Sequence, residues 1–113
     1  MESIIVQTRQ ECLKLKIEDI YYIMSHPSRP HCIQIVTDDS NYNFFQSLQI
    51  IEDQYSGYFV RCHRNCLVNL AKIKSINVKE RVIVLGERGQ YQVAFSRRRH
   101  QKILQEWINQ GGV

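Results

Sequence analysis

The sequence predicts a mainly β domain with two short helices. Several short segments alternate apolar with polar side chains, which is the pattern of half-buried strands. Turn-forming residues separate these segments, and the apolar spacing changes to that of a helix in only two places. The length of 113 residues, with 43% hydrophobic and 23% charged residues, fits a single globular domain over residues 1–113.

Four strands are predicted in the first half of the chain. Their apolar residues stand at alternating or successive positions, and turn chemistry lies between them. Pro27 and Pro30 cannot donate to a sheet ladder, so residues 25–30 should form a loop. The predicted strands are residues 12–17, 20–24, 32–36 and 42–45.

A helix and then a meander are predicted next. The apolar residues of the helix have the spacing of one helix face, and Gly57 is well placed to end it. Residues 73–95 should form a meander with turns near residues 79–80 and 86–89. The residues on the apolar face of the helix are Phe44, Leu48, Ile51 and Tyr55.

The chain should end in a second short helix that packs on the sheet. Ser96 is a natural N-cap, and the three arginines at residues 97–99 would lie in the first turn. The helix macrodipole disfavours each cation there by about 0.3–1 kcal/mol, whereas free backbone N–H groups and guanidinium groups together attract an anion. This turn is therefore predicted to be an anion site. The apolar stripe of the helix is Ile103, Leu104, Trp107 and Ile108.

Charge is distributed unevenly along the chain. Residues 1–56 have four basic and eight acidic side chains, a net charge of −4. Residues 57–113 have eleven basic and three acidic side chains, a net charge of +8. Such asymmetry indicates one face directed at a polyanion.

Two basic stretches in the second half have side chains that recognise nucleic acid. Residues 59–69 place arginine, histidine and asparagine beside apolar, strand-like residues, and residues 95–100 place three arginines and a histidine at the end of a predicted strand and the start of the last helix. Arginine reads guanine with two hydrogen bonds, asparagine reads adenine, and any cation neutralises a phosphate. Neither stretch has the pattern of a catalytic motif.

Location and cofactors follow from what the sequence lacks. No apolar run approaches the roughly 18 residues of a membrane span, and the N-terminus lacks the basic and apolar regions of a signal peptide. We therefore expect a cytoplasmic protein with free thiols, no membrane partner and no cofactor.

Cys62, His63 and Cys66 lie close together in the sequence and raise two hypotheses. A zinc site is disfavoured, because no second Cys/His pair has suitable spacing and strand alternation would turn Cys62 and His63 to opposite faces. We therefore predict no metal site. Cys62 is also a candidate redox-sensitive residue, because neighbouring cations lower a thiol's pKa. The alternative is an inert, buried thiol.

The order of these elements resembles the LytTR family of DNA-binding domains. The resemblance covers residues 3–108 and is most specific in the Phe-x-Arg-x-His-Arg-x-x-Leu-Val-Asn stretch of residues 59–69 together with residues 93–99. It is nearest to the quorum-sensing branch typified by the accessory gene regulator and the competence regulator, a branch associated with virulence. The resemblance implies an elongated arrangement of small antiparallel sheets with a short side helix and a short C-terminal helix.

The resemblance also implies partners. Loops between strands would enter successive major grooves of double-stranded DNA at paired direct repeats in promoters. The chain would be the output domain of a two-component response regulator, with a receiver domain that 113 residues cannot include and a sensor histidine kinase upstream. We expect a monomer that pairs on its DNA repeats.

Three loops match the family's reading positions. The first ends near His31, the second spans residues 63–65, and the third spans residues 96–99, where Arg98 best fits the base-reading position. Asn65 stands where the family commonly has serine, and Cys66 where it commonly has an aromatic residue. The candidate DNA-binding residues are Arg29, His31, His63, Arg64, Asn65, Ser96, Arg97, Arg98 and Arg99.

Three other functions compete with DNA binding. An RNA-binding module fits the charge and the β content, and is the main alternative. A metal-free nuclease using His63 is disfavoured, because paired catalytic carboxylates are not visible. A pure protein-interaction domain leaves the basic second half unexplained. We therefore favour sequence-specific DNA binding for transcription regulation, without enzymatic activity.

Overall fold

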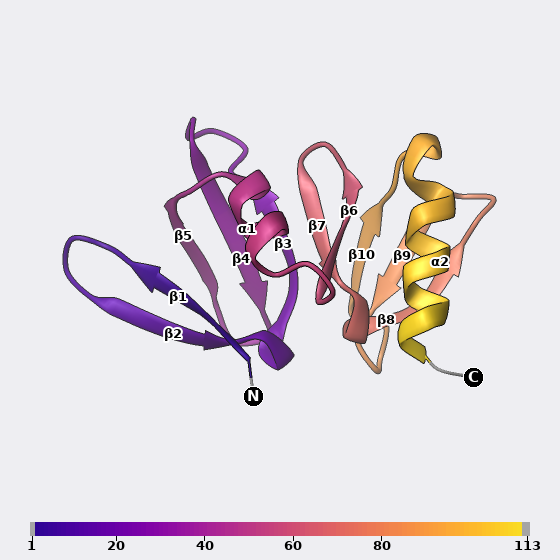
Figure 1. Ribbon diagram of the computed structural model, residues 1–113, viewed down its shortest axis with the longest axis horizontal. Helices are drawn as coiled ribbons and strands as arrows, with labels where there is room; N and C mark the ends of the chain where they lie inside the picture. Colours follow the sequence, from indigo (N-terminus) through magenta and orange to yellow (C-terminus); the bar gives the residue numbers. More distant parts are fainter. Residues whose placement is uncertain (1, 112–113) are drawn as a thin grey trace.

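Three antiparallel sheets follow one another along an elongated molecule. The structure is a computed structural model that describes residues 2–111, with principal extents of 43 × 30 × 26 Å. Figure 1 shows the sheets arranged along the long axis in the order of the chain, with one helix beside the middle sheet and the other at the C-terminal end. The predictions of a mainly β fold, an elongated arrangement of small antiparallel sheets and two short helices are confirmed.

The first sheet is a two-stranded hairpin, the second has five strands in the order β5-β4-β3-β7-β6, and the third is the meander β10-β9-β8. Helix α1 connects β5 to β6, and helix α2 follows β10. The bounds are β1 Ser3–Gln7, β2 Cys12–Lys16, β3 Ile20–Ser25, β4 Cys32–Thr37, β5 Asn41–Phe45, α1 Leu48–Gln54, β6 Phe59–His63, β7 Cys66–Asn69, β8 Ile73–Asn77, β9 Val82–Leu85, β10 Tyr91–Ala94 and α2 His100–Gly111.

Two elements differ from the sequence prediction. Strand β1 was not predicted, although it buries Ile4 and Val6 on alternate positions opposite β2. Phe44 lies in β5 and not on the face of α1, because α1 begins only at Leu48. Ser47 fixes that start by accepting the backbone N–H of Ile50 at 3.2 Å, as an N-cap does.

The five-stranded sheet has a hydrophobic core on each face. The first core lies between this sheet, the β1–β2 hairpin and α1, and the second lies between the sheet, the β8–β10 meander and α2. Ile23 and Leu67 belong to the first core, whereas Val60 and Val68 belong to the second. Because both faces are covered, all four residues of β7 are buried.

Polar side chains bind β3 to the segments around it. Asn69 is 1% exposed, and its side-chain amide donates to the carbonyl oxygens of Ile17 and Ile20 at 2.9 and 2.8 Å. Tyr21 donates to Asp38 at 2.8 Å, and burial followed by this hydrogen bond raises the pKa of Tyr21 to about 12. Gln90, after the meander turn, donates to the Tyr21 hydroxyl at 3.1 Å and so joins the second and third sheets.

Helix α2 packs against β6 and the connection between β7 and β8. Its stripe is narrower than predicted: Ile103 is 1% exposed and Trp107 packs on the second core, but Ile108 is 60% exposed. The arginines at residues 97–99 form a separate 3-10 turn before α2 and not its first turn. Within residues 2–111, neither helix has the length and apolar composition needed to cross a membrane.

Candidate nucleic-acid interface

Three loops meet at one edge of the molecule, the upper edge in Figure 1. They are the first loop (residues 26–31, between β3 and β4), the second loop (residues 63–65, between β6 and β7) and the third loop (residues 96–99, between β10 and α2). Ser25 N donates to Asn65 O and Ser96 N donates to Cys62 O, each over 2.9 Å. These bonds join the loops side by side, so all nine candidate residues lie at this edge.

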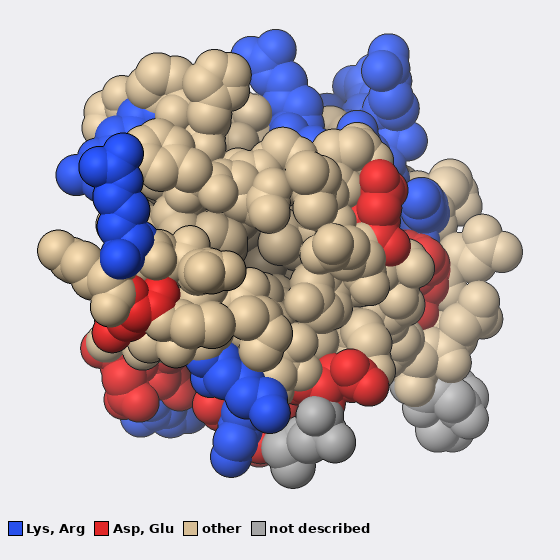
Figure 2. All heavy atoms as spheres, turned by 60° about the vertical axis from the view of Figure 1, so that its left-hand side comes forward, with Lys and Arg blue, Asp and Glu red and all other residues tan. Residues whose placement is uncertain are grey.

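Most side chains at this edge are exposed and have no acidic partner. Arg29, Arg64, Arg97 and Arg98 are exposed. Within residues 2–111, the single ion pair joins Glu52 to Arg61, which is not among the candidate residues. Figure 2 shows Lys and Arg side chains standing out from the upper edge, where no Asp or Glu is seen, whereas the middle and lower parts of that face have both basic and acidic side chains. An unpaired cationic edge of this kind attracts a polyanion.

The first loop is shaped by a histidine ring and two prolines. His26 Nδ1 accepts the backbone N–H groups of Ser28 and Arg29 at 3.2 and 3.1 Å. His31 has a φ of 60°, a left-handed conformation that histidine adopts more readily than most residues. Its carbonyl accepts the N–H of Gln46 at 3.1 Å, which ties the end of the loop to β5. Arg29 and His31 are left pointing into solvent.

The second loop is held by a side chain that sequence reasoning did not select. Arg61 pairs with Glu52 of α1, with 2.9 Å between Nη2 and Oε1, and its Nη1 donates to the Arg64 carbonyl at 2.6 Å. Asn65 N donates to His63 Nδ1 at 3.1 Å. Arg61 is therefore a positioning residue, and Arg64 and Asn65 at the tip are free to meet a ligand. Only the fold brings Glu52 to Arg61, so the sequence gives no signal for this pair.

The imidazole ring of His63 is neutral and can donate one hydrogen bond. Partial burial, followed by the charges of Arg99, Arg61 and Arg64, lowers its pKa below the ordinary value. The ring is therefore neutral at pH 7, and because Nδ1 accepts from Asn65, the proton lies on Nε2. An imidazole N–H in this setting can donate to a phosphate oxygen or to purine N7.

The third loop presents arginine side chains from a short 3-10 turn. Ser96 takes the N-cap position, but its hydroxyl makes no capping hydrogen bond, contrary to the prediction of a side-chain cap. The turn closes through Arg99 N, which donates to Ser96 O at 3.1 Å. Arg97 and Arg98 are exposed, while Arg99 is half-buried beside His63. The Ser96 hydroxyl and two guanidinium groups are thus available at the edge.

Comparison with known proteins identifies the family. The model of the LytTr DNA-binding domain matches residues 10–109 of this chain. The chain belongs to the LytTr DNA-binding domain family. LytTr is a family of DNA-binding domains and not an enzyme class, which agrees with the prediction from residues 59–69 and 93–99.

A solved LytTr structure has the same fold. It is the LytTr DNA-binding domain of a protein described as a methyl-accepting/DNA response regulator from Bacillus cereus. The two chains share 17% sequence identity with a TM-score of 0.72, and the match covers 94% of this chain and 96% of the other. A search of curated proteins found no match.

The basic edge formed by the three loops extends further than the sequence indicated. A cavity of about 310 Å³ beside the third loop is lined by Lys79, Arg81, Arg97 and His100, together with Val78 and Phe95 and with no acidic residue. Of the two basic residues Lys79 and Arg81, the first was predicted only as part of a turn at residues 79–80 and the second was given no role. Their positive charge was the available signal, but the position of this turn beside the third loop is a tertiary feature.

An exposed aromatic residue, Phe45, also lies at this edge, next to the first loop. Phe45 has 78% of its surface exposed, whereas its neighbour Phe44 is buried. It is the last residue of β5, which is an edge strand, and it points to the face opposite Phe44. With Arg29 it lines a cavity of about 450 Å³ next to the first loop.

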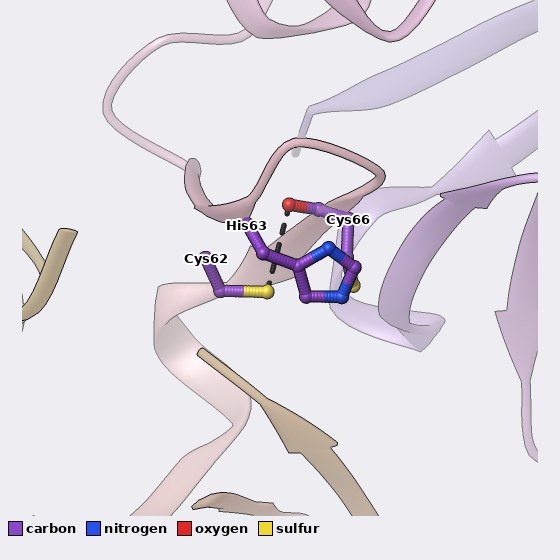
Figure 3. Close-up of side chains that lie close together, drawn as sticks. All are labelled: Cys62, His63 and Cys66. Carbon is purple, nitrogen blue, oxygen red and sulfur yellow. Dashed lines mark hydrogen bonds between the residues drawn. The ribbon is translucent and has the colours of Figure 1, made fainter. Parts of the chain in front are cut away.

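Cys62 does not have the exposure that the redox hypothesis needs. Its exposed fraction is 0%, and its thiol donates to the Cys66 carbonyl at 3.5 Å (Figure 3). The hydrogen bond with the Cys62 thiol, together with burial, raises the pKa of the Cys66 thiol. The structure therefore agrees with the alternative that Cys62 is a buried thiol.

Proposed function

We propose that this LytTr domain binds double-stranded DNA in a sequence-specific manner and regulates transcription as the output domain of a two-component response regulator. The supporting observation is the single edge at which three loops present unpaired guanidinium, imidazole and amide groups. The solved structure described above comes from a protein described as a response regulator, which supports this context.

The shape of the molecule suits binding along one side of a duplex. One turn of B-DNA is about 34–36 Å long, and the long axis of the domain measures 43 Å. The first and third loops are separated along this axis, with the second loop between them (Figure 1). The domain is thus long enough to lie along about one turn of the duplex, over which its loops can enter successive major grooves.

The side chains divide into two roles. Arg98, Arg64, Asn65 and His31 supply base contacts, because their planar or amide groups match base edges in the major groove. The other basic side chains at the edge bind phosphates and give affinity that falls with salt. Two domains would bind paired direct repeats in a promoter, with a receiver domain and a sensor histidine kinase controlling them in the complete system.

The test is a fluorescence-anisotropy titration with a duplex selected from random DNA, repeated across a salt series. Arg98→Ala should weaken binding to the selected duplex by about 1–3 kcal/mol and relax the preference at one base pair. Lys14→Ala is the matched control, because Lys14 is an exposed cation on β2, away from the three loops.

Three outcomes are informative. Equal losses on selected and scrambled duplex would make Arg98 a phosphate contact. Failure to enrich any duplex would contradict sequence-specific binding. Preference for single-stranded RNA over duplex DNA would favour the RNA-binding alternative.

A further inference from the structure

Three potential metal ligands lie together beneath the second loop. The ligand atoms of Cys62, His63 and Cys66 all lie within 4.8 Å of one another (Figure 3). The two cysteines are buried, with 0% and 2% of their surface exposed, and His63 is half-buried. Within residues 2–111, this is the one group of three or more such ligands at metal-binding separation. The DNA contacts proposed above do not use the two thiols.

An irregularity in the β6–β7 hairpin produces this cluster. The pairing of β6 with β7 shifts register between Arg61 and His63, which leaves Cys62 unpaired. The extra residue of a bulge interrupts the regular alternation of side chains. The expectation that alternation would separate Cys62 from His63 as ligands is therefore wrong, and the argument against a metal site based on it no longer holds.

The ligand set and its spacing suit a thiophilic ion. Zn²⁺ binds thiolate and imidazole ligands, and three protein ligands leave a fourth position for water. Bonds of about 2.3 Å to sulfur and about 2.0 Å to nitrogen place two sulfurs and one nitrogen of a tetrahedral site roughly 3.5–3.8 Å apart. The three ligand atoms, now within 4.8 Å, need only a small approach. The thiols give up only weak hydrogen bonds, of 3.5 and 3.7 Å to backbone carbonyls.

The surrounding charges require both thiols to be bound as thiolates. Arg61, Arg64 and Arg99 lie near His63 and would repel an uncompensated dication. Two thiolates neutralise Zn²⁺, so the occupied cluster has no net charge facing these guanidinium groups. Each bound ion releases the two thiol protons to solvent.

We propose that Cys62, His63 and Cys66 bind one Zn²⁺ ion and that its binding rearranges the second loop. His63 Nδ1 accepts the backbone N–H of Asn65 at 3.1 Å. If Nδ1 binds the ion, it gives up this hydrogen bond. If Nε2 binds the ion, the ring proton moves to Nδ1, which then faces the Asn65 N–H as a second donor. Either way the bond is lost, and the loop that presents Arg64 and Asn65 changes shape.

The first experiment titrates the reduced, chelator-treated chain with Zn²⁺ alone, in competition with a chromophoric zinc indicator. We expect one ion per chain and, with Co²⁺ in place of Zn²⁺, the absorption bands of tetrahedral cobalt with thiolate ligands. His63→Gln and Cys66→Ser should each weaken binding by more than about tenfold. Cys32→Ser is the matched control, because Cys32 is a buried thiol (4% exposed) outside the cluster.

Two results would overturn the site. One is equal affinity for Zn²⁺ in the parent chain and in His63→Gln; the other is binding that depends on Cys32 and not on Cys66. Circular dichroism shows whether each variant is folded. If Cys66→Ser does not fold, His63→Gln decides, because its side chain lies at a half-buried loop position.

A second experiment tests the rearrangement, and this step rests on the proposed function. The Zn²⁺-saturated chain should bind its selected duplex about tenfold more weakly than the metal-free chain, and the duplex should weaken Zn²⁺ binding by the same factor. Unchanged DNA affinity with the ion bound would overturn the rearrangement. Absence of DNA binding by the metal-free chain would contradict the proposed function, whereas the Zn²⁺ titration alone decides the site.

Discussion

The first and second loops each contain a histidine ring that accepts backbone hydrogen bonds, but they differ in the buried contacts that support them. In each, a histidine Nδ1 accepts backbone N–H groups: His26 accepts those of Ser28 and Arg29, and His63 accepts that of Asn65. Beneath the second loop lie two buried cysteines and the Arg61–Glu52 ion pair. The residues of the first loop from 27 to 31 are all exposed.

The conformation of a binding loop can thus be held in two ways, by contacts with the rest of the domain or by residues within the loop. The second loop is fixed by tertiary contacts, so its shape should persist as long as the domain is folded. The first loop is fixed by its own prolines and histidine, so its shape should change without unfolding the domain. Substitutions in the second loop should therefore affect stability and DNA binding together, and substitutions in the first loop should affect mainly DNA binding.

Arg61→Ala should have the largest effect. It removes a partly buried ion pair and the donor to the Arg64 carbonyl, so the free energy of unfolding should fall by about 2 kcal/mol. DNA affinity should fall as well, although Arg61 is not proposed to touch DNA. Urea denaturation measures the first effect and anisotropy the second.

A double-mutant cycle with Glu52→Gln is the control for this prediction. The two substitutions should be non-additive, because each removes the same ion pair. Additive losses in the free energy of unfolding would mean that Arg61 acts independently of Glu52. The ion pair would then not be what supports the second loop.

His26→Ala should have an intermediate effect, confined to the first loop. The N–H groups of Ser28 and Arg29 lose their acceptor but can bind water, so stability should fall by no more than about 0.5–1 kcal/mol. Amide hydrogen exchange at residues 28 and 29 should become faster while exchange in β3 and β4 stays unchanged. A global loss comparable to that of Arg61→Ala would break the distinction between the loops.

Pro30→Ala should have the smallest effect on stability. Proline restricts the unfolded chain, so its removal should cost about 0.4–1 kcal/mol without loss of any contact. DNA affinity should fall modestly, because the looser loop must be ordered on binding. Calorimetry in the presence and absence of the selected duplex measures both. A gain in affinity would show that the loop's own shape opposes binding.

The sequence predicted the elements that rest on local patterns. Alternation located the last strand, β10, to within one residue, the two prolines located the first loop, and the basic stretches marked the second and third loops. Phe44 was misassigned because it packs in the same first core as Leu48 and Ile51, so its spacing imitates a helix face although it comes from β5. The spacing of Phe44 from the α1 residues therefore reflects packing in the same core and not membership of the same helix.

The support of the site could not be predicted, because it depends on contacts between distant segments. Nothing local pairs Glu52 with Arg61, or joins Ser25 to Asn65 through the backbone. The register shift between Arg61 and His63 could not be predicted either, because the alternation of apolar and polar residues assumes regular strand pairing. The sequence therefore predicted the groups at the edge, and the structure was needed to show what holds them.

The position of β7 has a consequence for how the domain is made in the cell. Strand β3 pairs with β7, and the Asn69 side chain donates to the carbonyl oxygens of Ile17, just before β3, and of Ile20, at its start, some fifty residues earlier in the chain. A chain emerging from the ribosome therefore presents β3 as an open edge until residues 66–69 are available. Residues 1–65 have a net charge of −2, and like charge of this kind opposes the association of two such open edges.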